Sequence, residues 1–490
     1  MSKSIKLNAV FKTLMSIINI LFPLLTAPYV ARILSVDGYT EYNRALNMVL
    51  WFSPFAVFGV YTYGMRTISQ IRNDKGECAF LFARLFLFNI FTSIFTSCIF
   101  LLVVLFGTTF QGYRLLYITI CLQLLCSCFA TDWFNEAFED YGFILTKTFL
   151  CKILYVISVF IFVQKESDVY VYVVLSSIFT AVNNVLTFLY AKKQINFVKV
   201  AVKDIIKLIK PLFLIFLLVN SSMLYTIFDR FVLMWFGNKL QLTYYTISQT
   251  IITSITNVTS SVVLVSIPRL SHLWATGEKV EYYKILDKSS SVFLALQTPC
   301  CIGMALLAKE IMWLYSGNNY LAGSNILCFF SLRYYLSAFD IIQAKQVLLA
   351  TGNERKLTKI YYIAGICNIT LKIILLLINR LTPELCIATT VVSDILVLFL
   401  EHYEIKKLKI QFNFISRTTR KYFITSLLFV PVVSGVKLIV GNFYGDEIIL
   451  RTILSVFLCS LIYAFVLIIS KDNLIYSIPF LNKIFRRKSV

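Results

Sequence analysis

The sequence predicts an all-α membrane protein that crosses the bilayer about fourteen times. Hydrophobic residues make up 58% of its 490 positions and charged residues only 14%, whereas soluble domains are roughly 45–50% apolar and about 25% charged. The mean hydropathy is +0.78. So few polar residues cannot cover a water-facing surface, which excludes a soluble arrangement of several domains.

Apolar stretches long enough to span a bilayer recur along the whole chain. The fifth stretch is interrupted by Lys147 and Lys152, whose long stems could carry their ammonium groups to the interface. The first contains Pro23 and Pro28, which predict a kink. The twelfth opens at Pro383, a residue suited to a first helical turn. The expected spans are 10–31, 45–65, 85–106, 115–134, 144–163, 169–191, 211–236, 244–267, 290–308, 324–344, 357–379, 383–403, 422–441 and 448–470.

The cations set the orientation of these spans. With the N-terminus in the cytoplasm, most of the 46 lysines and arginines fall in segments that face the cytoplasm, and every such segment holds at least two. This follows the positive-inside rule, and an even number of spans returns the C-terminus to the cytoplasm. The net charge of +21 is therefore explained by topology, and no nucleic-acid partner is indicated.

Neither a metal nor a cofactor is expected. Most of the twelve cysteines lie inside apolar stretches, where they are simply small packing residues. The two histidines, His272 and His402, are far apart and lack the spacing of metal ligands. No glycine is followed by lysine, so the chain contains no Walker A loop. No catalytic residue is predicted, and the chain is not expected to be an enzyme.

Two parts of the chain are alike, which indicates an internal repeat. In each, an arginine closes a span (Arg32, Arg230), and an inner loop after the next span begins with a second arginine (Arg66, Arg269). A repeat of six spans is parallel, and such halves form two lobes about an axis along the membrane normal. The expected domains are an N-terminal lobe at 1–206, a C-terminal lobe at 207–405, and two additional spans with a basic cytoplasmic tail at 406–490.

Several segments resemble the Wzx-type polysaccharide flippases of the multidrug/oligosaccharidyl-lipid/polysaccharide exporter superfamily. The likeness covers the whole chain, and it rests on the order and spacing of several segments rather than on one motif. These segments are PLLTAPYVARILSVDGY (23–39), FGVYTYGMRTISQIRND (58–74), DWFNEAFEDYGFILTK (132–147), KPLFLIFLLVNSSMLYTIFDRFVL (210–233) and IPRLS (267–271).

The resemblance implies two six-helix lobes in a V around a central cavity that opens to one face at a time. It implies that the substrate is an undecaprenyl-diphosphate-linked oligosaccharide repeat unit of O-antigen or capsule. This unit would move from the cytoplasmic to the outer leaflet of a bacterial inner membrane. Membrane lipid is an implied partner, and a polysaccharide polymerase and chain-length proteins are further candidates.

A diphosphate needs cations, and arginine can meet its oxygens bidentately. Arg333 and Lys372 lie deep in the tenth and eleventh spans, where a charge is costly unless it faces protein or water. Other candidates are Arg66 and Arg269, at the cytoplasmic ends of the second and eighth spans, and Arg32 and Arg230, near the outer ends of the first and seventh spans. As alternatives, Lys372 could extend to the interface, Arg66 and Arg269 could simply set the topology, and Arg32 and Arg230 could simply anchor the helix ends.

Four aspartates are candidates for a coupling H⁺ or Na⁺, or for ion pairs. Asp394 is the most central acid, and it or Asp340 could neutralise Arg333. Asp229 stands beside Arg230 near the outer end of its span, where interface anchoring is the alternative. For Asp132, the simplest expectation is a pair with a lysine.

Four other functions are alternatives to this one. A polysaccharide polymerase would need a sizeable outer loop, and a membrane glycosyltransferase an acidic or metal-binding loop; neither is evident. An ion-coupled drug exporter of the same superfamily would want an acid in the first lobe, yet 10–31 contains no Asp or Glu. A membrane scaffold would leave Arg333 unexplained.

Overall fold

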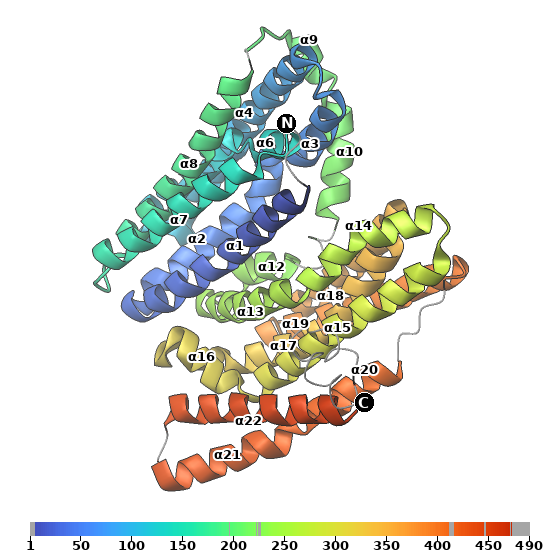
Figure 1. Ribbon diagram of the computed structural model, residues 1–490. Helices are drawn as coiled ribbons and strands as arrows, with labels where there is room; N and C mark the ends of the chain where they lie inside the picture. The colour runs from blue at the N-terminus through green and yellow to red at the C-terminus, as the bar shows by residue number, and fades with distance from the viewer. Residues whose placement is uncertain are drawn as a thin grey trace. The chain divides into compact units, whose positions relative to one another are not determined.

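The computed structural model describes residues 5–195, 197–221, 223, 227–410, 416–444, 447–470 and 472, which form helices joined by short turns and loops, with no β-strand among them. The prediction of an all-α polytopic membrane protein is confirmed. The helices (Figure 1) are α1 (Ile5–Ile33), α2 (Val36–Val57), α3 (Val60–Ile71), α4 (Lys75–Phe106), η1 (Thr108–Tyr113), α5 (Arg114–Leu125), η2 (Cys126–Phe129), α6 (Asp132–Ala137), α7 (Tyr141–Phe162), α8 (Val169–Gln194), α9 (Val202–Ile206), α10 (Ile209–Asn220), α12 (Phe228–Phe236), α13 (Lys239–Thr259), α14 (Ser261–Ala275), α15 (Lys279–Leu306), α16 (Ala308–Ser316), η3 (Asn318–Gly323), α17 (Ser324–Ile341), η4 (Ile342–Leu349, a π-helix), α18 (Glu354–Leu377), α19 (Pro383–Lys407), α20 (Arg417–Leu427), α21 (Phe429–Tyr444) and α22 (Ile448–Ile469).

Within the described residues, eleven helical segments are long and apolar enough to cross a membrane. The pair α13 and α14, bent by 43°, brings the number to twelve if it is one span. The apolar part of α1 is shorter, and the seventh expected span is divided between α10 and α12. A total of fourteen spans therefore stays a prediction.

Contacts divide the chain into two compact units. Unit 1 comprises Met1–Ser221 and Gly237–Thr243, and unit 2 comprises Ser222–Phe236 and Tyr244–Val490. The expected domain limits at 206 and 405 stay predictions, and each unit is described by itself.

In unit 1 an aromatic core holds α3, α4 and α6 together. The ring of Phe82 lies 5.6 Å from that of Trp133 and 5.0 Å from that of Phe134. Gly64 permits this packing, because a Cβ built at that position would lie 2.4 Å from a Trp133 ring atom. Phe58 and Gly59 have positive φ angles of 43° and 77°, which end α2 and turn the chain into α3.

In unit 2 the last helices pack on α15 and α16. Tyr463 of α22 donates a hydrogen bond to the carbonyl of Ala295 at 2.8 Å, and Lys437 of α21 lies 3.0 Å from Glu310 Oε1. Helices α21 and α22 lie side by side (Figure 1). The two additional spans thus share the core of unit 2.

Helix α19 carries four buried polar residues of unit 2, namely Thr390, Ser393, Asp394 and Glu401. It begins at Pro383, as predicted, and the Thr382 side chain accepts a hydrogen bond from the Leu385 amide. This cap satisfies one of the donors that a helix start leaves open.

Candidate functional site

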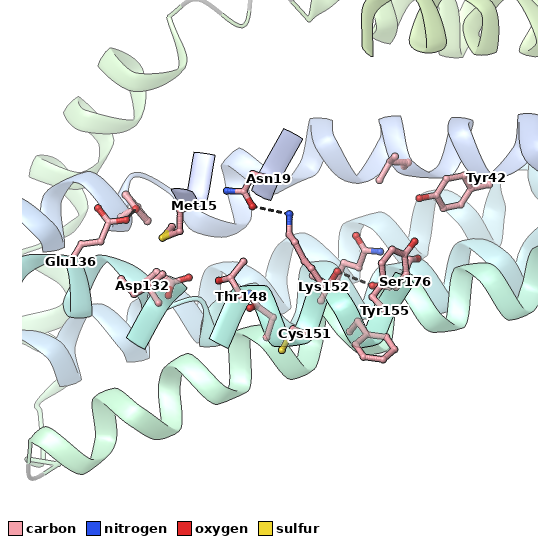
Figure 2. Close-up of a pocket in the computed structure, with 17 residues that line it drawn as sticks. Met15, Asn19, Tyr42, Asp132, Glu136, Thr148, Cys151, Lys152, Tyr155 and Ser176 are labelled. Atoms are coloured by element: carbon pink, nitrogen blue, oxygen red, sulfur yellow. Dashed lines mark hydrogen bonds between the residues drawn. The ribbon is translucent and has the colours of Figure 1, made fainter. Parts of the chain in front are cut away.

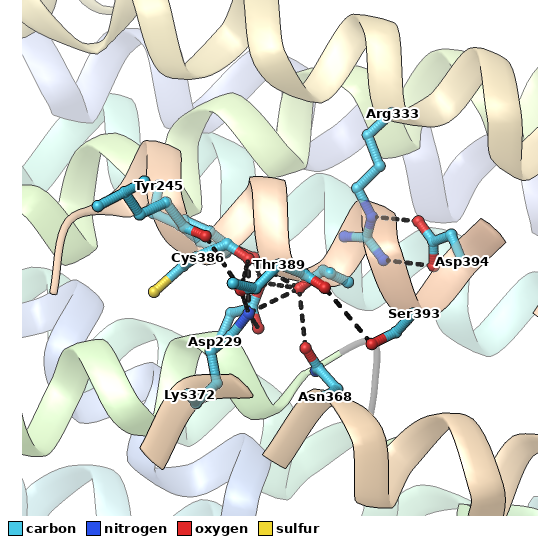
Figure 3. A network of polar contacts seen from close by, with 11 residues as sticks. Asp229, Tyr245, Arg333, Asn368, Lys372, Cys386, Thr389, Ser393 and Asp394 are labelled. Atoms are coloured by element: carbon cyan, nitrogen blue, oxygen red, sulfur yellow. Dashed lines mark hydrogen bonds and ion pairs between the residues drawn. The ribbon is translucent and has the colours of Figure 1, made fainter. Parts of the chain in front are cut away.

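Lys372 is enclosed by oxygen atoms inside unit 2 (Figure 3). Its Nζ lies 3.1 Å from Asp229 Oδ1. It donates hydrogen bonds to the Cys386 carbonyl at 2.6 Å, to Thr390 Oγ1 at 3.0 Å and to the Thr389 hydroxyl. Helices α12, α18 and α19 together therefore satisfy an ammonium group that no water reaches.

The carboxylate of Asp229 meets Lys372 through Oδ1 and accepts hydrogen bonds through Oδ2. The hydroxyls of Tyr245 and Thr390 each donate a hydrogen bond to its Oδ2 at 2.7 Å. Both Asp229 and Lys372 are 0% exposed. A buried charge is tolerated only when it is paired and hydrogen-bonded, and this pair meets both conditions. The two residues form a neutral structural link between three helices.

Arg333 and Asp394 form a second buried ion pair. The guanidinium Nε donates to Asp394 Oδ2 at 2.7 Å, and an Nη donates to Oδ1 at 3.4 Å. Thr390 of α19 contacts both Lys372 and Asp229, and Asp394 follows it by one turn. The two ion pairs therefore meet adjacent turns on one face of α19 (Figure 3). Of the two candidate partners of Arg333, Asp340 and Asp394, the structure pairs it with Asp394. Asp340 instead accepts a hydrogen bond from Tyr361 at 3.2 Å.

Two of the alternatives left open for this region do not fit the structure. Lys372 does not extend to the interface, because it is fully buried and paired. Asp229 does not anchor the helix at the membrane surface, because it is also fully buried. Its neighbour Arg230 donates a hydrogen bond from Nε to Gln249 Oε1 at 2.6 Å. Arg333, Lys372 and Arg230 therefore each have a partner within the protein.

The other candidate cations lie elsewhere. The side chain of Arg269 is 66% exposed and lies 3.7 Å from Glu281 Oε1. Arg32 and Arg66 belong to unit 1, and both are exposed. None of the three takes part in the network around Lys372.

Unit 1 contains a polar cavity of about 450 Å³ between α1, α7 and α8 and their neighbours (Figure 2). Two helices present one face to it at the spacing i, i+3, i+4, i+7, which places side chains in a single stripe. The cavity is lined from α7 by Thr148, Cys151, Lys152 and Tyr155, and from α8 by Ser176, Phe179, Thr180 and Asn183. Met15, Asn19, Tyr42, Leu46, Tyr61, Gln123, Asp132, Glu136 and Ile144 complete the lining.

Asp132 is held at one end of this cavity by a lysine of α7. Lys147 Nζ lies 3.1 Å from Asp132 Oδ1, and the Thr187 hydroxyl donates to the same oxygen at 3.2 Å. The predicted pairing of Asp132 with a lysine is confirmed. Lys147 does not reach the interface, since it is only 5% exposed.

Other polar groups of the cavity are also hydrogen-bonded within unit 1, as Gln123 is to Ser177. Lys152 donates a hydrogen bond to Asn19 Oδ1 at 2.7 Å, and Tyr61 donates to Glu136 Oε1 at 2.6 Å. Amides, hydroxyls and tyrosine rings in one cavity can hydrogen-bond a polar ligand and pack against its apolar faces. Its volume lies within the usual range of about 300–1,000 Å³ for small-molecule sites.

Sequence reasoning missed this cavity, although a signal for it exists. Ser176, Thr180 and Asn183 stand at i, i+4 and i+7 within an otherwise apolar span, and Thr148, Lys152 and Tyr155 repeat that spacing in the preceding one. Polar residues on one face of a spanning helix mark a bundle interior or a water-filled cavity. Within the described residues, no cluster of His, Cys, Asp and Glu could hold a metal ion.

Comparison with known proteins agrees with this architecture. The chain is 23% identical to the "Putative O-antigen transporter" of Shigella dysenteriae over 72% of this chain and 88% of that protein. Its fold resembles that of the lipid II flippase MurJ in an inward closed conformation, with a TM-score of 0.70, 14% identity, and coverage of 94% of this chain and 98% of that one.

An inward-facing multidrug resistance MATE transporter of the MOP superfamily is also similar in fold. Its TM-score is 0.59 at 12% identity, over 79% of this chain and 95% of that one. These relatives agree with the resemblance to Wzx-type flippases drawn from the sequence. Residues 5–274, more than half of the chain, match the family described as "Polysaccharide biosynthesis protein", and the chain therefore belongs to that family.

Proposed function

We propose that the chain is a flippase for an undecaprenyl-diphosphate-linked oligosaccharide repeat unit. It moves this unit from the cytoplasmic to the outer leaflet of a bacterial inner membrane for O-antigen or capsule assembly. The physical task is to carry a hydrated glycan and a diphosphate past hydrocarbon, and no covalent chemistry is required. The lipid tail can remain in the bilayer while the polar head passes through protein.

The polar cavity of unit 1 is the observation that carries this proposal. It places amides, hydroxyls and tyrosine rings inside spanning helices whose outer faces are apolar. Polar groups at this depth are costly unless they face protein or water, so their gathering into one cavity indicates a path for a polar solute. A glycan presents the matching chemistry of hydroxyl groups on ring faces.

The burial pattern divides the candidate cations between two roles. Arg333 and Lys372 are already neutralised by Asp394 and Asp229, so we assign them to holding the helices of unit 2 in register. The exposed Arg66 and Arg269 are better suited to draw in an anionic head group at the cytoplasmic side. Arg32 and Arg230 would then act near the outer side.

In this proposal the cavity opens to one side of the membrane at a time, and this alternating access needs a source of energy. The four aspartates remain the candidates for binding a coupling H⁺ or Na⁺. Asp394, Asp229 and Asp132 are each engaged by a cation, so they could bind a coupling ion only when those pairs open. Asp340 contacts a tyrosine hydroxyl rather than a cation at ion-pair distance among the described residues, which makes it the most available of the four.

Deletion of the gene tests the proposed function. We expect lipid-linked repeat units to accumulate in the cytoplasmic leaflet, where a membrane-impermeant glycan-oxidising reagent applied to spheroplasts cannot reach them. The wild-type gene supplied on a plasmid restores their labelling and the surface polysaccharide. Unchanged surface polysaccharide in the deletion strain would contradict the proposal.

Export of a cationic small molecule is the second candidate, and one observation favours it. Asp132 and Glu136 of α6 line the cavity of unit 1, so the first lobe does offer acids, although not from the first span. Asp132 is neutralised by Lys147, which leaves Glu136. If the deletion strain becomes sensitive to cationic drugs while its polysaccharide is unchanged, this second function replaces the first.

A further inference from the structure

The cavity of unit 1 contains an ammonium group, that of Lys152, for which the described residues provide no acidic partner. Lys152 is the twelfth of the 22 residues of α7, near the middle of a spanning helix. Its Nζ donates to Asn19 Oδ1 at 2.7 Å, and in the part of the chain that the structure describes no carboxylate lies within ion-pair distance of it. Asn19 supplies only a neutral acceptor, so one positive charge is left uncompensated.

The neighbouring cation on the same helix shows how this protein treats a structural lysine. Lys147 is buried and held by both Asp132 and Thr187. The two acids that line the cavity are also engaged, Asp132 by Lys147 and Glu136 by the Tyr61 hydroxyl. Figure 2 shows these acids toward one end of the cavity, while Lys152 lies farther along and faces Asn19. Thus neither of the acids that line the cavity is placed to neutralise Lys152.

We propose that the Lys152 ammonium binds an anionic oxygen group carried by a sugar that enters this cavity. The inference rests on the proposed function and names the class of its cargo: a sugar with a carboxylate or a phosphate. Tyr155 lies three residues along the same face of α7 and also lines the cavity, so a ring held against it would lie beside Lys152. Asn19 orients the ammonium and can share the same ligand.

The two sources of such a group are an acidic sugar within the repeat unit and the phosphate at its reducing end. D-Glucuronate is a probe for the first and glucose 1-phosphate for the second, with D-glucose as the neutral reference. Binding is measured as the ligand-dependent rise in melting temperature of the purified full-length protein in detergent. The wild type is compared with Lys152→Gln, Lys152→Arg and the control Lys192→Gln, which removes an exposed cation at the end of α8.

We expect at least one anionic sugar to stabilise the wild type, the control and Lys152→Arg more than glucose does. Loss of a charge-assisted hydrogen bond should weaken that binding about 10- to 100-fold in Lys152→Gln. A response to glucuronate assigns the group to an acidic sugar, and a response to glucose 1-phosphate alone assigns it to the phosphate end. The proposal is overturned if glucose binds as well as both anions, if no probe binds, or if Lys152→Gln keeps the full response.

Export in cells separates this inference from the proposed function. If Lys152→Gln binds normally and the deletion strain still loses surface polysaccharide, the protein is a flippase but Lys152 does not recognise its cargo. If the deletion strain keeps its polysaccharide, the flippase assignment fails whatever the probes show.

Discussion

Lys372 Nζ lies 3.1 Å from Asp229 Oδ1, and both side chains are wholly shielded from solvent. The pair links α18 to α12, a helix of only nine residues. Removing one partner of a buried ion pair leaves an uncompensated charge, whereas replacing both can be nearly neutral. This asymmetry distinguishes a structural pair from a cation reserved for substrate.

Replacing Lys372 alone should therefore destabilise the protein. We expect Lys372→Met to lower the free energy of unfolding by about 3–5 kcal/mol, because Asp229 is left buried without a counter-charge. The double variant Lys372→Met/Asp229→Asn should recover most of the loss. Thermal unfolding in detergent measures both, and a single variant as stable as wild type would show that the pair does not hold α12.

Arg333 should tolerate lysine better than alanine. Its guanidinium meets both oxygens of Asp394, and lysine can replace the charge but not the planar fork. We expect export of repeat units to be lost in Arg333→Ala and partly retained in Arg333→Lys, measured by surface polysaccharide at matched protein abundance. Normal export by Arg333→Ala would mean that the Arg333–Asp394 pair is dispensable.

Gly64 should not accept a methyl group. A Cβ at this position would lie 2.4 Å from the buried ring of Trp133, and overpacking typically costs about 1–3 kcal/mol. We expect Gly64→Ala to lower the melting temperature. Gly112→Ala is the matched control, since nothing lies within 4 Å of a Cβ there. Equal melting temperatures for both variants would contradict the tight contact between α3 and α6.

Asp132 should matter for stability more than Glu136, although both line the same cavity. Asp132→Asn removes the counter-charge of buried Lys147, and an unsatisfied charged group costs about 1–3 kcal/mol or more. Glu136→Gln removes an acid whose described polar partner is the Tyr61 hydroxyl, which can still donate to an amide oxygen. The two variants are compared by thermal unfolding, and a larger loss for Glu136→Gln would reverse the assignment.

The sequence predicted the features that depend on hydropathy and on charged residues inside the membrane-spanning segments. Long apolar stretches have few alternatives to helix in a bilayer, so the helical class followed directly. Asp394 could be named in advance, beside Asp340, as a candidate partner of Arg333, because a charge inside a spanning helix is costly unless it is paired. The same reasoning gave Asp132 a lysine partner.

Features that depend on how helices pack could not be predicted. Interface anchoring was the alternative for Asp229 because it stands near the outer end of its expected span, but the surrounding helices bury it completely. Lys147 and Lys152 stand five residues apart in an apolar run, and hydropathy alone could not distinguish their opposite surroundings. The position of α6 gives Lys147 its partner Asp132, whereas Lys152 faces the cavity and Asn19 of α1.

Reconstitution tests the central claim most directly. The purified protein is incorporated into vesicles that contain a polyprenyl-diphosphate-linked glycan with a fluorescent sugar, and an external impermeant quencher reports the fraction in the outer leaflet. After the outer pool has been destroyed, we predict that protein-containing vesicles replenish it from the inner leaflet. Replenishment no faster than in protein-free vesicles would contradict the flippase assignment.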